Sequence, residues 1–105
     1  MFGATQMATA SAPFETTASM NIYKLPGYQL RRPLIIEIEH DAEAGYIVSD
    51  PSTGVHHYAQ DLGDALTAFL RVFVNEFEFL RSNRNDLSSA MAAEFERFRQ
   101  IIAIE

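Results

Sequence analysis

Two adjacent histidines, His56 and His57, are the residues of this chain best suited to metal binding or acid–base chemistry. They lie within VSDPSTGVHHYAQDLGDAL, residues 48–66, where three aspartates accompany them: Asp50, Asp61 and Asp64. Imidazole nitrogens and carboxylate oxygens bind zinc, and histidine also transfers protons in many enzymes. The stretch is therefore a metal site, a catalytic centre or an ordinary strand that carries imidazoles.

The expected local structure argues against a shared metal ion. VHHYAQ, residues 55–60, has the composition of a strand, and adjacent side chains of a strand point to opposite faces. A zinc site would need one of the two histidines to join His40 and a carboxylate from another strand. We therefore expect no metal and no cofactor, and leave open a pH-sensing role for His40, His56 or His57.

Other catalytic patterns are missing from the sequence. The chain has no cysteine, which excludes thiolate nucleophiles, disulfides and thiolate metal sites. Ser49 and Ser52 flank a turn and have no base assigned to them, and no glycine-rich phosphate loop occurs. We expect a protein that is not an enzyme.

Acidic residues dominate the middle of the chain, whose formal net charge is −6. Between Pro33 and Leu70 there is no Lys or Arg, but there are seven acids: Glu37, Glu39, Asp41, Glu43, Asp50, Asp61 and Asp64. Such a surface repels phosphate backbones and favours a basic protein surface. We therefore expect no direct nucleic-acid binding and predict a partner-binding surface of four acids: Glu37, Glu39, Asp41 and Glu43. The alternative is a solvated acidic face without a partner.

The elements that position these residues fit one domain of 105 residues. Residues 1–20 are rich in Ala, Thr and Ser and lack the basic and apolar regions of a secretory signal, so we predict a flexible tail. No apolar run approaches the roughly 18 residues of a membrane span. We expect a cytoplasmic protein with no membrane contact.

Three strands are predicted over residues 34–40, 45–50 and 55–60. In the first, apolar residues at 34, 36 and 38 alternate with Ile35, Glu37 and Glu39, so one face is apolar and the other is mostly acidic. Gly-containing turns join the strands. Short turns make neighbouring strands antiparallel, so the three form a meander, which residues 21–24 could extend.

Two helices should follow. Asp61 or Asp64 begins the first, over residues 62–80, and Asp86 begins the second, over residues 87–103. The second helix has an apolar stripe: Met91, Phe95, Phe98 and Ile102. This stripe packs either against the first helix or against another subunit; on the second interpretation these four residues form an oligomer interface.

Residues 34–75 resemble the HicB-like antitoxin domain in their turns and caps. The matching positions are Asp41, Glu43, Gly45 and Tyr46, then Asp50, Pro51 and Gly54, then Asp61, Asp64, Ala65 and Leu66. The resemblance implies a sheet with a helix on one face, assembly as a dimer or tetramer, and binding of a small basic RNA-cleaving toxin. The DNA-binding segment of many members is not carried over, because Glu94 and Glu96 offset Arg97 and Arg99.

These observations predict an α+β domain over residues 21–105: a three-stranded antiparallel meander with one packed helix and a second, C-terminal helix. The function predicted with it is a non-enzymatic interaction module that binds a basic protein and self-associates. The alternative is a structural subunit of a larger complex with no toxin partner.

Overall fold

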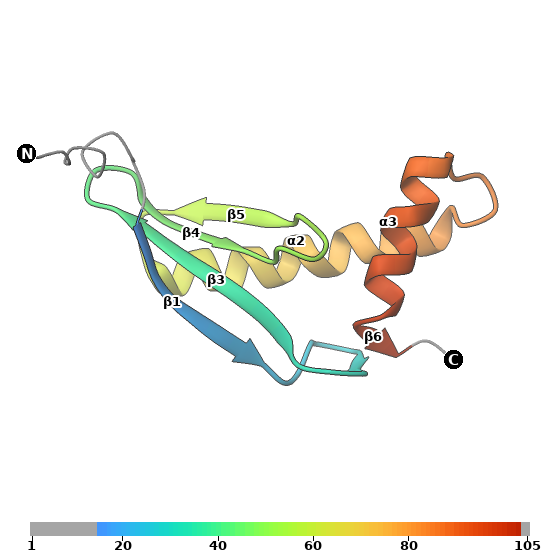
Figure 1. The fold of residues 1–105 in the computed structure, drawn as a ribbon, viewed down its shortest axis with the longest axis horizontal. Helices are drawn as coiled ribbons and strands as arrows, with labels where there is room; N and C mark the ends of the chain where they lie inside the picture. The colour runs from blue at the N-terminus through green and yellow to red at the C-terminus, as the bar shows by residue number, and fades with distance from the viewer. Residues whose placement is uncertain (1–14, 104–105) are drawn as a thin grey trace, which may run out of the picture.

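A computed structural model describes residues 15–103 of the chain and shows an α+β fold (Figure 1). Its elements in chain order are β1 (Glu15–Ile22), β2 (Gln29–Leu30), β3 (Leu34–Asp41), β4 (Gly45–Ser49), β5 (His56–Ala59), α2 (Leu62–Ser82), α3 (Ser89–Arg99) and β6 (Ile102–Ala103). The predicted fold class is confirmed. Among the described residues, no helix is long and apolar enough to cross a membrane.

The main sheet has four antiparallel strands in the order β1-β3-β4-β5, so the prediction of three strands was one short. The meander β3-β4-β5 is as predicted. The additional strand β1 includes residues 15–20, which were predicted as part of the tail; residues 1–14 lie outside the described residues.

Pairing with β3 explains why β1 forms although its own sequence, ETTASMNI, is a weak strand signal. Met20 lies opposite Ile36 and Ile22 opposite Leu34, so the strand extends the apolar surface of its neighbour. Strand formation depends on such cross-strand packing more than on intrinsic propensity.

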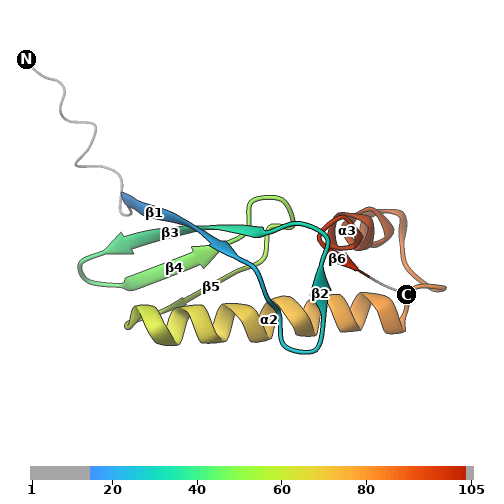
Figure 2. The same cartoon turned by 90° about the horizontal axis from the view of Figure 1, so that it is seen from below.

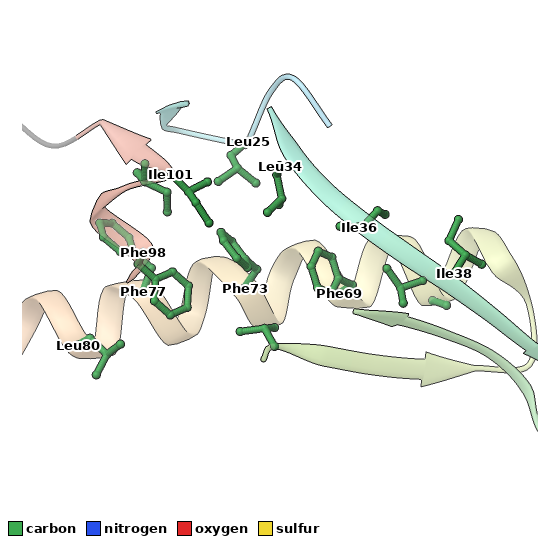
Figure 3. Packing of buried hydrophobic residues seen from close by; sticks show 14 residues of the cluster. Leu25, Leu34, Ile36, Ile38, Phe69, Phe73, Phe77, Leu80, Phe98 and Ile101 are labelled. Carbon is green, nitrogen blue, oxygen red and sulfur yellow. The ribbon is translucent and has the colours of Figure 1, made fainter. Parts of the chain in front are cut away.

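Helix α2 runs along one side of the main sheet (Figure 2). It begins at Asp61, whose side chain accepts a hydrogen bond of 3.1 Å from the Asp64 backbone N–H, so Asp61 is the cap of the two aspartates considered. Its buried stripe includes Phe69 and Phe73, which lie on the side of the helix that faces β3 (Figure 3). Further along the stripe, Phe77 packs against Phe98 of α3, with ring centroids 6.0 Å apart.

Helix α3 crosses the C-terminal part of α2, and the chain then pairs β6 with β2 in a second small sheet (Figure 1). The prediction of a helix over 87–103 was too long at both ends. Ser88 is the N-cap, with its Oγ accepting from the Met91 N–H at 3.2 Å. The helix ends at Arg99 because the following backbone pairs with β2, as in the 2.7 Å bond from Arg31 N–H to the Ile101 carbonyl.

Candidate protein-interaction face

The face of the main sheet opposite α2 is not covered by any element of residues 15–103 (Figure 2). We call it the open face. Alternation along β3, β4 and β5 gives it these residues: Ile35, Glu37, Glu39, Asp41, Ile47, Ser49, His56 and Tyr58. Ile35 and Tyr58 are 50% and 53% exposed, whereas the three apolar β3 residues facing α2 are buried: Leu34, Ile36 and Ile38. The open face therefore presents apolar side chains to the surroundings.

The strand register arranges the open face in two rows. In one row Glu39 lies opposite Ile47, which lies opposite Tyr58. In the next, Glu37 lies opposite Ser49, which lies opposite His56. Neighbouring strands are about 4.8 Å apart, so each row spans about 10 Å. Acidic and apolar groups thus lie within the reach of a single partner element.

A shallow hollow of about 470 Å³ lies over the β4–β5 side of this face. Ile47 and Tyr58 line it together with Ala44, His56 and His57. A hollow lined by an aliphatic and an aromatic side chain suits an apolar anchor residue of a binding partner.

The structure separates the four acids predicted to bind a partner. Glu37 and Glu39 are half-buried side chains of the open face. Asp41 lies at the end of β3, where its Oδ2 accepts a 2.7 Å hydrogen bond from the Ala44 backbone N–H, so it also stabilises the β3–β4 turn. Glu43 is exposed in that turn. Glu37 and Glu39 are therefore the acids best placed for binding.

No cationic side chain neutralises the open face from within the main sheet, because β1, β3, β4 and β5 contain no Lys or Arg. Across residues 15–103 the ion pair observed joins Arg99 and Glu96 on α3, at 2.9 Å. Within residues 15–103, no Lys or Arg forms an ion pair with Glu37 or Glu39.

The two adjacent histidines point to opposite faces. His56 is exposed on the open face, with Nδ1 3.1 Å from the Gly54 carbonyl, whereas His57 lies on the α2 side. His40, also on the α2 side, packs against Tyr46 with ring centroids 4.5 Å apart. In the described part of the chain, no three His, Asp or Glu side chains form a group that could hold a metal ion.

Asp50 has a structural role in the β4–β5 turn. Asp50 is 2% exposed, and its carboxylate accepts hydrogen bonds from the backbone N–H and the hydroxyl of both Ser52 and Thr53, at 2.6–3.3 Å. With these partners the carboxylate is satisfied and fixes the turn before His56.

A second carboxyl pair lies where α2, α3 and the β4–β5 turn meet. Glu76 and Glu94 line a cavity of about 230 Å³ together with His56. Partial burial raises the pKa of Glu76, and the neighbouring Glu94 raises it further. The ionised form of Glu76 is therefore disfavoured where the two helices meet.

The structure places two of the four residues of the predicted oligomer interface in the core of a single chain. Phe98 and Ile102 are fully buried within one chain. The ring centroids of Phe98 and Phe73 are 4.9 Å apart. Phe98 and Ile102 cannot also contact a subunit without opening the core. This favours packing against the first helix, and only the half-buried Met91 and Phe95 still fit the interface prediction.

Comparison of the chain with protein-family models, with curated proteins and with solved structures finds no match. The resemblance of residues 34–75 to the HicB-like antitoxin domain therefore stays a prediction. Tyr58 is the main residue of the open face that sequence analysis did not single out. The alternation of residues 55–60 indicates which face of the strand Tyr58 occupies. It does not indicate that Tyr58 lies beside Ile47, because that depends on the strand register.

Proposed function

We propose that this chain is a non-enzymatic interaction module that binds a basic protein through its open face. One observation carries the proposal: Glu37 and Glu39 lie among exposed apolar side chains on an uncovered sheet that contains no Lys or Arg. Protein interfaces commonly combine apolar anchors with charged groups that meet opposite charges on the partner.

The same charges disfavour stacking of two copies by their open faces. Such a pair would bring Glu37 and Glu39 of one copy toward the same acids of the other, and like charges at an interface are strongly unfavourable. A partner with Lys or Arg around an apolar anchor avoids this repulsion. The resemblance to HicB-like antitoxins supports a small basic protein, such as an RNA-cleaving toxin, as the partner.

The test compares capture by the tagged full chain with capture by Glu37→Gln/Glu39→Gln. Two lost surface charge contacts are together worth about 1.4 kcal/mol, so affinity for the captured basic protein should fall about tenfold. Binding of the unaltered chain should also weaken as salt rises. The control Asp86→Asn/Glu96→Gln changes net charge equally, away from the open face, and should bind as the unaltered chain does. Equal binding by all three proteins would contradict the proposal.

A structural subunit of a larger complex is the second candidate function. Phe79, on α2, is 53% exposed and lies outside the open face. An exposed aromatic side chain suits apolar assembly contacts that salt does not weaken. Capture that resists salt and is lost in Phe79→Ser, but not in Glu37→Gln/Glu39→Gln, would favour this function.

A further inference from the structure

We propose that two copies of this chain pair through the outer edge of β1, antiparallel, and so join their main sheets into one. β1 and β5 are the edges of the main sheet, and no element of residues 15–103 pairs with the outer side of β1. β1 has eight residues and β5 has four, so β1 offers the longer edge. An unpaired edge exposes backbone N–H and C=O groups that can hydrogen-bond to a further strand.

The regular part of this edge, residues 18–22, lacks the features that normally prevent strand addition. A register irregularity between Thr16 and Ala18 leaves ASMNI, residues 18–22, as the regular segment. It contains no Lys, no other charged residue and no Pro, which are the usual protections of an edge strand. Its side chains up to Asn21 are exposed.

The side chains of this segment indicate what it should pair with. Ala18, Met20 and Ile22 pair with β3 residues that face α2, so they form an apolar row on the α2 side of the sheet. Met20 is nevertheless 40% exposed, because the row lies at the sheet edge. Ser19 and Asn21 form a polar row on the opposite side. An added strand should therefore have an apolar row and a polar row of the same spacing.

A second copy of β1 meets this requirement by symmetry. With Met20 opposite Met20, Ala18 lies opposite Ile22 and Ser19 opposite Asn21, so apolar meets apolar and polar meets polar. A two-fold axis perpendicular to the sheet generates this arrangement, which is the commonest oligomer symmetry. The surface needed is self-complementary, and no other partner chemistry is required.

Charge does not oppose this pairing. The nearest acid of the open face is Glu37, which lies beside Ser19 on β3. Three strand spacings would separate the two copies of Glu37, about 14 Å, which exceeds the Debye length of about 8 Å at physiological salt. The joined sheet would carry both open faces on the same side. The pairing of the two copies does not depend on the proposed binding of a basic protein.

The first test is the molar mass of the full chain in solution, by light scattering after size exclusion. We expect a dimer for the unaltered chain and a folded monomer for Met20→Lys, because a charge in the apolar row would be buried at the joint. The control Tyr58→Lys, also at an exposed residue of an edge strand, should stay dimeric. A monomeric unaltered chain would overturn the inference, as would a dimer that tolerates Met20→Lys.

Disulfide trapping tests the register without depending on Met20→Lys. The chain has no cysteine, so single substitutions give clean results. Directly opposite Cα atoms in an antiparallel pair lie about 4.5–5.5 Å apart, within disulfide range. Met20→Cys should form a covalent dimer on mild oxidation, and Asn21→Cys should not, because Ser19 lies opposite it. Failure of Met20→Cys to cross-link, or equal cross-linking by both variants, would reject the proposed pairing.

Discussion

Ile35 and Ile36 are neighbours on β3 with opposite surroundings: Ile35 is 50% exposed on the open face, and Ile36 is fully buried under α2. The same side-chain chemistry therefore serves two purposes one residue apart. Ile36 belongs to the core that holds the sheet on the helix, whereas Ile35 contributes to the surface that we propose for binding.

Truncating each of these two side chains should affect the stability of the fold very differently. Ile36→Ala removes a buried side chain and should lower the free energy of unfolding by about 2–5 kcal/mol. Ile35→Ala should change it by no more than about 0.5 kcal/mol, as is usual for surface substitutions. Urea denaturation followed by circular dichroism measures both. Similar losses for the two variants would mean that the open face is covered in the folded protein.

Gly45 is required by the turn that leads into β4. It has φ +103°, and a Cβ added there would collide with the backbone of Ala59 and Gln60. Gly54 has φ +81° but nothing within 4 Å of the added Cβ. Gly54→Ala should therefore cost only the backbone strain of about 1–2 kcal/mol, and Gly45→Ala should cost clearly more. Equal thermal shifts for the two variants would contradict the close approach of β4 and β5.

Glu76 should make stability depend on pH in an unusual direction. Its pKa in the folded chain is raised by burial and by Glu94, so the fold favours the protonated carboxyl. Its destabilising effect is therefore complete above the raised folded pKa and disappears as pH falls toward the unfolded value. We expect Glu76→Gln to raise the urea midpoint at pH 7 and to reduce the gain in stability on mild acidification.

Two controls isolate the contribution of Glu76. Glu96→Gln removes an exposed carboxyl of α3 and should leave the pH dependence almost unchanged. His56 lines the same cavity as Glu76 and Glu94, so the comparison is repeated in a His56→Gln background. If Glu76→Gln has the same pH dependence as the unaltered chain in both backgrounds, the carboxyl pair has no effect on stability.

The meander and the first helix could be predicted from sequence because their signals are local. Alternation in LIIEIEHD, the turn residues before Gly45 and Gly54, and the cap at Asp61 each specify structure within a few residues. The same alternation placed Glu37 and Glu39 on one face. Local pattern was sufficient where one strand face is buried and the other is not.

The errors concern elements that depend on distant partners. β1 has little strand signal of its own and forms against β3. Ile102 continues the apolar spacing of α3 but leaves the helix to pair with Leu30, more than seventy residues earlier. A helical spacing of apolar residues could not reveal that pairing, and it therefore could not show which part of the stripe is buried within the chain.

The small β2–β6 sheet also has a consequence for biosynthesis. Phe73 and Phe77 leave the ribosome before Phe98 and Ile102, which complete the core around them. Until those later residues emerge, the nascent chain exposes aromatic surface that chaperones recognise, and the long-range pairing delays closure of that end. We therefore expect the end of the molecule around α3 to mature after translation of β6, whereas the meander and the start of α2 can fold while synthesis continues.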